Sequence, residues 1–392
     1  MAAAVLSLSA CEASSVDTPP EMRAPDLATP ADGPVDAAME PTGFLGVPES
    51  QFESWRYRAI GGYACGDGST GGVLVNLTKK SRRLLVFLDG RGACWDADGC
   101  IGPTPTAFLG PVDDGMVQKW FGTHAFPGDL RAGVFDRTDA TNPFRDDNFV
   151  YLVDCGGDAF LGANLWPYML GNGKSATVFH FGYQNVAVAL GQLTAAFADT
   201  PRLVLAGAGT GGIGALGNYW QVATAFAAVK GPLPILVDDA GPVFSATWLS
   251  TATQATFQDA WGIVATVDSY CPACAPKMGT GYVEMWRAVA LARPGMRGAF
   301  VSSSGDAEMV RLYSRLDGDP MFDAPKFRLA LDETGHAFDA AEAALAPARL
   351  RYFYYPGAAH GALATAPLST TPGFADFLAK ELADDPAWKS VF

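Results

Sequence analysis

Two residues late in the chain have the types and order of a catalytic acid and base. Asp306 lies in the loop Ser303–Met309, and His360 lies in the loop Pro356–Gly361, each just after a predicted strand. A buried carboxylate can fix the tautomer of an imidazole, whose other ring nitrogen then accepts the proton of a nucleophile. The pair therefore predicts a site for nucleophilic attack on a carbonyl group, with the nucleophile supplied by another part of the chain.

The stretch that must supply the nucleophile runs from Arg202 to Trp220, RLVLAGAGTGGIGALGNYW. Its apolar run, glycine cluster and helically spaced small residues predict a strand, a sharp turn and a helix. In the nucleophile elbow of α/β-hydrolases, G-x-S-x-G, a serine stands at this turn. Gly209 occupies the serine position here, so the reactive oxygen is missing. Thr210 is no substitute, because the residue after the nucleophile normally contributes its backbone N–H.

Other interpretations of these residues stay open at this point. Gly207, Gly209 and Gly212 also spell G-x-G-x-x-G, a dinucleotide-binding turn, but the next acidic residues follow about 30 positions later instead of about 20. The cluster could also be a plain glycine-rich loop. Asp306 could be the N-cap of a helix that begins AEMVRLYSRL, and His360 could be a histidine of a surface loop.

Strands and helices alternate along the rest of the chain. Predicted helices follow the glycine turn and span residues 186–196 and 373–383. This alternation predicts an α/β fold, α/β-hydrolase-like, with a mostly parallel sheet and helices on both faces. Ligands of such sheets bind beyond the carboxyl ends of the strands, where the chemistry-bearing loops fall. The predicted strands are residues 72–77, 83–88, 148–153, 202–206, 234–237, 299–302 and 351–355.

Several motifs resemble the pectin acetylesterase family, which includes the Notum carboxylesterases. The similar segments lie between Tyr63 and Leu363 and are, in order, FLDGRGACWD, NPFRDDNFVYLVDCGGD, HFGYQN, the elbow, DDAG and the loops of Asp306 and His360. The resemblance implies cleavage of acetyl or acyl esters by a Ser-His-Asp triad. It implies that Asp306 is the triad acid, His360 the base and Gly209 the nucleophile position.

The resemblance also implies an oxyanion loop, where the sequence departs from the family a second time. Gly90, Arg91 and Gly92, together with Thr210, stand at the oxyanion and pocket positions, and Arg91 replaces a glycine that the family usually has. One backbone donor of an oxyanion hole stabilises the transition state by about 3–4 kcal/mol. Arg91 is expected either to block the hole or to supply a guanidinium in place of the lost donor.

These residues favour a serine carboxylesterase scaffold that is inactive as written, because Gly209 replaces the serine. The expected substrate is a small-molecule or carbohydrate ester, and no cofactor or metal is expected. The alternative is a surface-tethered pseudoenzyme that binds an acylated glycan or another ester without hydrolysis, since two changes at one site suggest a changed purpose. A third interpretation lets His360 activate a water molecule, with a rate only about 10³- to 10⁴-fold above that in solvent.

Composition and the first 40 residues limit the partners and the location. The 392 residues carry a net charge of −14 with only 27 Lys and Arg, which argues against nucleic acid or an anionic lipid surface as a partner. Residues 1–11 resemble a lipoprotein signal ending at Cys11, although no basic residue precedes it. Residues 12–40 predict a disordered Pro/Ala-rich tether, and residues 41–392 the α/β-hydrolase-like domain. The protein is expected to be exported and anchored at a bacterial cell envelope by a lipid on Cys11.

Six cysteines remain when Cys11 is set aside. An even number in an exported protein predicts disulfides, whose connectivity the sequence leaves open. A zinc site is the alternative, because Cys94 and Cys100 are closely spaced, as are Cys271 and Cys274. The six are Cys65, Cys94, Cys100, Cys155, Cys271 and Cys274.

Overall fold

Each central strand of the sheet comes from a short apolar run. A computed structural model of the chain describes residues 44–117, 130–345 and 349–392, which belong to one compact unit, Pro41–Phe392. In β3 (Leu84–Asp89) and β4 (Asn148–Val153) every residue is buried, as expected of strands that are covered on both faces. The predicted signal segment 1–11, with Cys11, and the predicted tether 12–40 lie outside the described residues.

Eight strands form the sheet, in the order β1-β2-β4-β3-β7-β8-β9-β10. The pairs β1 with β2 and β2 with β4 are antiparallel, and the other five pairs are parallel. The fold is therefore mixed α/β with a large, mostly parallel sheet, as the sequence predicts. The remaining strands are β1 (Arg56–Ala64), β2 (Thr70–Asn76), β7 (Leu203–Ala208), β8 (Ile235–Asp239), β9 (Arg297–Ser303), β10 (Arg349–Tyr355) and the separate hairpin of β5 (Asn164–Met169) and β6 (Ser175–His180).

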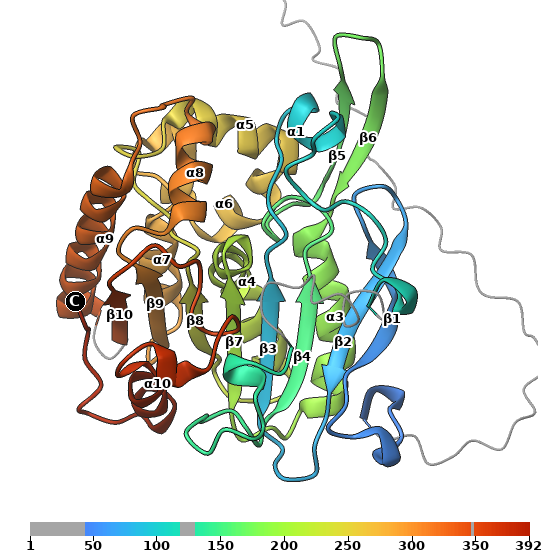
Figure 1. Ribbon diagram of the computed structural model, residues 1–392, viewed down its shortest axis with the longest axis vertical. Helices are drawn as coiled ribbons and strands as arrows, with labels where there is room; N and C mark the ends of the chain where they lie inside the picture. The colour runs from blue at the N-terminus through green and yellow to red at the C-terminus, as the bar shows by residue number, and fades with distance from the viewer. Residues whose placement is uncertain (1–43, 118–129, 346–348) are drawn as a thin grey trace, which may run out of the picture. The chain divides into compact units, whose positions relative to one another are not determined.

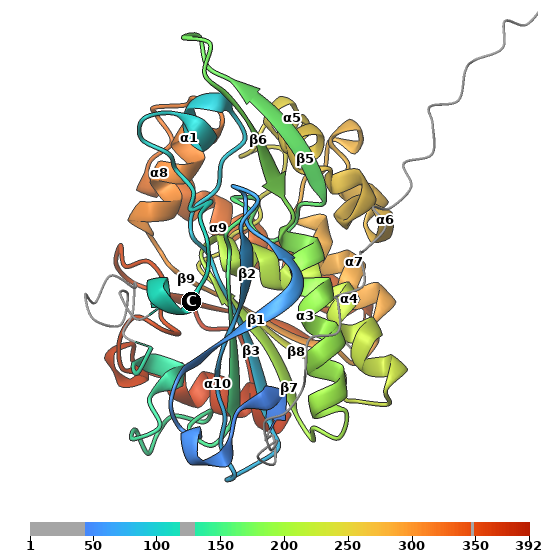
Figure 2. The same ribbon diagram turned by 90° about the vertical axis from the view of Figure 1, so that its right-hand side faces the viewer.

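Helices flank this sheet on both faces. Helices α3, α4 and α7 lie on one face and α10 on the other (Figures 1 and 2). On the α10 side, Phe353 of β10 packs against Phe374 and Phe377, with ring centroids 5.1 Å apart in each pair. The α-helices are α1 (Ala97–Ile101), α3 (Gly182–Phe197), α4 (Thr210–Ala228), α5 (Thr251–Trp261), α6 (Val267–Tyr270), α7 (Glu284–Ala292), α8 (Ala307–Leu316), α9 (Ala324–Leu345) and α10 (Phe374–Ala383). In the described part of the chain, none of the helices has the length and hydropathy needed to span a membrane.

The parallel register brings the ends of several strands to one edge of the sheet. Asp89 of β3 is in register with Ala208 of β7, Ala208 with Asp239 of β8, and Asp239 with Val301 of β9. The loops that follow these strands therefore open on the same side. Helices α1 and α8 and the β5–β6 hairpin gather at this edge, the upper end in Figure 1.

The seven predicted strands are confirmed, with both ends of each within two residues of the observed ends. The sequence analysis missed β1, the β5–β6 hairpin, the helices between β8 and β9, and α9. β1, RYRAIGGYA, has an exposed or half-exposed side chain at most positions, because it is an edge strand and needs no continuous apolar run. The hairpin is also largely exposed, so its hydrophobic signal is weak.

The six cysteines form three disulfides, which confirms the prediction that they pair. Cys65–Cys155 joins two segments 90 residues apart in sequence, after β1 and after β4. Cys94–Cys100 and Cys271–Cys274 close much shorter loops, with separations of 6 and 3 residues. Because a cross-link restricts the unfolded chain more when it closes a longer loop, Cys65–Cys155 is expected to contribute most to stability.

Replacing Cys65 and Cys155 together by serine should lower the free energy of unfolding by about 4–5 kcal/mol, on the loop-entropy estimate. The matched control, Cys271→Ser with Cys274→Ser, should lower it by only about 1–2 kcal/mol, because its loop is short. Urea denaturation followed by circular dichroism measures both. Equal losses for the two double variants would contradict this account of the longer cross-link.

Candidate functional site at the carboxyl ends of the strands

The turn between β7 and α4 is built as a tight elbow around Gly209. Gly209 has φ 58° and ψ −127°, a backbone region that favours glycine and is strained for other residues. Its N–H donates a hydrogen bond of 2.8 Å to the carbonyl oxygen of Asp239, at the end of the neighbouring strand β8. Thr210 begins α4, so its N–H has no acceptor within the helix and points toward the edge of the sheet.

Asp306 contacts two different segments with one carboxylate. As the N-cap of α8, it accepts hydrogen bonds of 3.0 Å from the N–H groups of Glu308 and Met309. Its two oxygens also lie 2.9 and 3.1 Å from Nδ1 of His360. Asp306 is fully buried, whereas the side chain of His360 is 30% exposed. The N-cap interpretation is therefore confirmed, and the same carboxylate also orients the imidazole.

The charges around His360 favour its protonated form. Burial lowers the pKa of the imidazole, but the hydrogen bond and charge of Asp306 raise it, and so do the charges of Asp239 and Glu308. The net result is a pKa above the ordinary value of histidine. With Nδ1–H donating to Asp306, Nε2 is left as the atom that can accept a proton.

The third predicted residue, Gly209, lies directly beneath that nitrogen. A Cβ atom built on Gly209 would be 2.7 Å from His360 Nε2. In space, His360 therefore lies between Asp306 and Gly209. This is the order that the predicted roles of acid, base and nucleophile position require. Three segments far apart in the chain supply them, because β7 and β9 are separated in the sheet only by β8.

The loop after β3 lies against the start of α4. A Cβ on Gly90 would collide with the backbone nitrogen and hydroxyl of Thr210, so only glycine allows this approach. The hydroxyl of Thr210 lies 3.4 Å from the carbonyl oxygen of Gly92. The structure therefore brings Gly90 and Gly92 against Thr210, the residue that follows Gly209 in the turn.

The side chain of Arg91 is directed to a different partner. Its Nε donates to the carboxylate of Asp89 at 2.5 Å, and the two side chains are only 13% and 6% exposed. Burial raises the pKa of the Asp89 carboxyl, while Arg91 and Tyr151 lower it, with a net increase. Arg91 does not line the hollow beside His360. We conclude that its guanidinium neutralises Asp89 instead of filling the space above Gly209.

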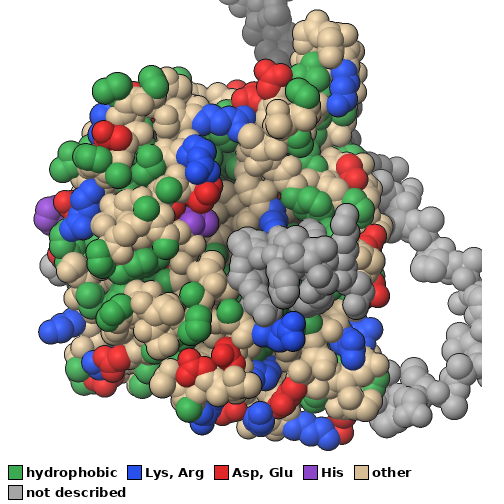
Figure 3. Space-filling model, viewed as in Figure 1, with side chains coloured by type: hydrophobic (Ala, Val, Ile, Leu, Met, Phe, Trp, Pro, Cys, Tyr) green, Lys and Arg blue, Asp and Glu red, His purple; other side chains and the backbone are tan. Residues whose placement is uncertain are grey.

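Two neighbouring hollows share Thr210 in their linings. The outer one, with a volume of about 560 Å³, reaches His360 and is bordered by Glu308, Arg311 and Arg315 of α8. Figure 3 views this face, which is hollowed near its centre with basic side chains beside the hollow. The inner one is a narrow apolar cavity of about 50 Å³. Its wall contains Trp95, Ala159, Leu161, Val243, Phe244, Phe257, Trp261, Tyr282 and Tyr313.

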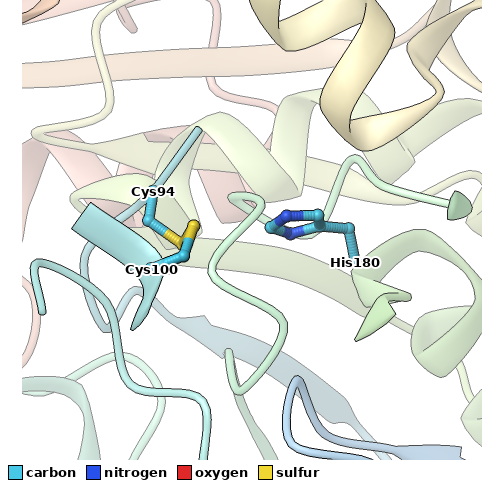
Figure 4. A group of neighbouring side chains, drawn as sticks. All are labelled: Cys94, Cys100 and His180. Atoms are coloured by element: carbon cyan, nitrogen blue, oxygen red, sulfur yellow. A yellow bond between two sulfur atoms is a disulfide. The ribbon is translucent and has the colours of Figure 1, made fainter. Parts of the chain in front are cut away.

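The zinc alternative does not fit the geometry of the cysteines. Cys94, Cys100 and His180 are the group of possible metal ligands found in the described residues, with their ligand atoms within 4.8 Å of one another. The two sulfur atoms are bonded to each other, and His180 faces them (Figure 4). Both ring nitrogens of His180 also have partners, the carbonyl oxygen of Gly156 at 2.7 Å and the hydroxyl of Tyr168 at 2.9 Å. In this buried group, the sulfur atoms are therefore held in a disulfide and the histidine nitrogens in hydrogen bonds.

The comparisons with known proteins give no family for the chain. No protein-family model matches it, and no curated protein is found to be similar. The interpretation of the site therefore rests on its residues and their geometry.

The sequence analysis missed two features of the site. Asp239 belongs to the DDAG motif, but nothing in the sequence assigned it a role; its position directly after a strand was the available signal. The aromatic wall of the inner cavity comes partly from Phe257, Trp261 and Tyr282. These residues lie between β8 and β9, a stretch in which the sequence analysis predicted no element.

Replacing Arg91 by glycine should lower the free energy of unfolding by about 3 kcal/mol at neutral pH, because it leaves a buried carboxylate without its cation. The loss should shrink as the pH falls through the raised pKa of the Asp89 carboxyl, which lies above the ordinary value of aspartate, because a protonated Asp89 needs no cation. Urea denaturation at several pH values tests this, with Arg91→Lys as the control that keeps a positive charge. A loss independent of pH would contradict the charge argument.

The imidazole of His360 should titrate above pH 6.5 in the chain as written, because Asp306 favours its protonated form. Asp306→Asn should move the pKa below that of ordinary histidine, since burial then acts with less opposing charge. Histidine ring NMR signals followed against pH measure both values, with His360→Gln used to assign the signal. An unchanged pKa in Asp306→Asn would contradict the proposed pairing.

Proposed function

We propose that the chain carries the site of a serine carboxylesterase of the α/β-hydrolase type, with the nucleophile position occupied by Gly209. The observation that carries the proposal is the alignment of Asp306, His360 Nε2 and Gly209 above a helix N-terminus. A Cβ on residue 209 would point at the one ring nitrogen that Asp306 leaves as an acceptor. Acyl transfer by this chemistry uses an acid, a base and a turn that carries the nucleophile, in this spatial order.

The order of the strands supports the same proposal. An eight-stranded, mostly parallel sheet in which the second strand runs in the opposite direction is the general plan of α/β-hydrolases. The elbow follows a central strand, and the acid and histidine follow strands later in the chain, the order found in that fold. The motifs similar to pectin acetylesterases and Notum carboxylesterases contribute to this site through the loops of Gly90, Asp239, Asp306 and His360.

A serine at position 209 would give the site a complete reaction path. His360 Nε2 would take the hydroxyl proton as Oγ attacks the ester carbonyl carbon, and the resulting oxyanion would face the N–H of Thr210. The protonated imidazole would then give its proton to the departing alcohol, leaving an acyl-enzyme. Water would cleave that intermediate by the same steps in reverse order. Asp306 would stabilise the imidazolium throughout.

The two hollows suggest how an ester would lie. The apolar cavity beside Thr210 would hold the acyl group, because most of its lining is aliphatic or aromatic. The outer hollow, bordered by charged residues of α8, would hold the alcohol part, a sugar or another small molecule. The three disulfides are consistent with the exported, envelope-anchored location that we propose from residues 1–11, and we propose no nucleic acid partner and no cofactor.

One observation favours the alternative, a pseudoenzyme that binds an ester or acylated glycan without cleaving it. The distance of 2.7 Å between a Cβ on Gly209 and His360 Nε2 is shorter than carbon and nitrogen atoms normally approach. As it stands, the imidazole occupies part of the space that a serine side chain would need. The site is therefore packed for glycine, although the imidazole lies at the end of a side chain and can move by a few tenths of an ångström.

Gly209→Ser tests the proposed function. It should produce burst kinetics with p-nitrophenyl acetate and raise hydrolysis about 10³-fold or more over the chain as written. Its kcat/KM should rise with pH through a midpoint above 6.5, because only the neutral imidazole accepts the proton and its pKa is raised. Gly209→Ala is the matched control, with the same backbone strain and no oxygen. Both variants should lose about 1–3 kcal/mol of stability.

A folded Gly209→Ser protein with no burst would contradict the esterase proposal. Calorimetric titration of the unmodified chain with intact acetylated oligosaccharides then separates the two candidates. Binding without turnover, in the unmodified chain and in Gly209→Ser alike, is the result expected of a pseudoenzyme.

A further inference from the structure

Asp239 is a buried carboxylate at the centre of the site that the triad itself does not use. It is the last residue of β8 and is fully buried. β8 lies between β7, which leads into the turn at Gly209, and β9, which leads to Asp306. Asp239 is therefore placed where it can contact both halves of the site.

Its contacts join those two halves directly. The backbone carbonyl oxygen of Asp239 accepts the N–H of Gly209 at 2.8 Å. Its side-chain Oδ2 accepts the N–H groups of Ala362 and Leu363, each at 2.7 Å. These are the second and third residues after His360, so one residue ties the histidine loop to the nucleophile turn.

The carboxylate also contributes charge. Burial raises the pKa of Asp239 to about 6, while the two N–H donors and His360 oppose that increase. Asp239 is therefore mainly ionised at neutral pH. The ionisable groups that act on His360 are Asp306, the N-cap of α8, Glu308 in the first turn of α8, Asp239 of β8 and Asp89 of β3. Among them, Asp239 is the one that also holds the backbone of the histidine loop.

We propose that Asp239 is a positioning residue that locks the His360 loop onto the turn at Gly209 and supplies a second negative charge behind the imidazole. Its catalytic meaning rests on the proposed function, but its effect on His360 does not. A purely structural role would need only an acceptor for two N–H groups, which a neutral side chain could provide. A buried carboxylate is more costly than such a side chain, and the charge near His360 accounts for its use.

The neighbouring residue gives a matched control. Asp238 is as fully buried as Asp239 and accepts the N–H of Gly241 at 3.0 Å. Burial, followed by the charge of Asp239, raises the pKa of Asp238 well above the usual range, so the charged form of Asp238 is disfavoured while Asp239 is ionised. Replacing Asp238 by asparagine removes a buried carboxyl from the same strand without removing a charge near His360.

The test measures the His360 ring signals by NMR against pH in the chain as written, in Asp239→Asn and in Asp238→Asn. Asn at 239 keeps an oxygen for Ala362 and Leu363 but removes the charge. The pKa of His360 should fall by about one pH unit in Asp239→Asn and stay unchanged in Asp238→Asn. Equal pKa values in all three folded proteins would overturn the proposal.

Two further measurements keep the test decisive. If Asp239→Asn does not fold, the unmodified protein provides the test. Its His360 signals should show a second inflection near pH 6, from ionisation of Asp239. A single inflection would overturn the proposal.

In the Gly209→Ser background, Asp239→Asn should move the acid limb of kcat/KM to lower pH with little change in KM. A silent Gly209→Ser protein removes the esterase proposal alone, because the NMR titration uses no substrate.

Discussion

The level at which β7, β8 and β9 end is the constraint on which the site depends. Parallel pairing sets Ala208, Asp239 and Val301 side by side, so the turn after β7 and the loop after β9 must open next to each other. The histidine loop then reaches the same place from β10, which pairs with β9. A slip of one residue in any of these pairings would turn the end residues to the opposite face of the sheet. The buried apolar runs that fix the register are therefore as necessary to the site as its polar residues.

Buried carboxylates are the second requirement, and each is stabilised in a different way. Asp306 receives helix N–H groups and an imidazole, Asp239 receives two loop N–H groups, and Asp89 is paired with Arg91. A buried charge is tolerated only with such partners. These partners in turn fix the loops that carry them, so the electrostatics and the loop geometry at this edge depend on each other.

The sequence was sufficient for the parts of this arrangement that depend on local pattern. Apolar runs marked the strands, the glycine cluster marked the turn, and the chain order of Gly209, Asp306 and His360 predicted that these three residues lie together. The direction of the Arg91 side chain could not be predicted, because it depends on Asp89 and Tyr151 lying together in the folded sheet. The link between Asp239 and the residues after His360 spans more than 120 positions, a separation that no local pattern encodes. Edge strand β1 was missed because exposed strands do not show the continuous apolar run that identified the central ones.

Glycine at position 209 relaxes the turn, whereas the buried carboxylates around His360 are costly to the fold. A positive φ is relaxed for glycine, so the turn itself is at its most stable without a nucleophile. The groups around it are not arranged for stability alone, since apolar residues in place of Asp239 and Asp306 would avoid the cost of burying carboxylates. These charges hold one imidazole with Nε2 directed at Gly209 and its proton affinity raised. The fold therefore keeps a proton acceptor, at an energetic cost, beside a turn whose glycine side chain has no proton to give.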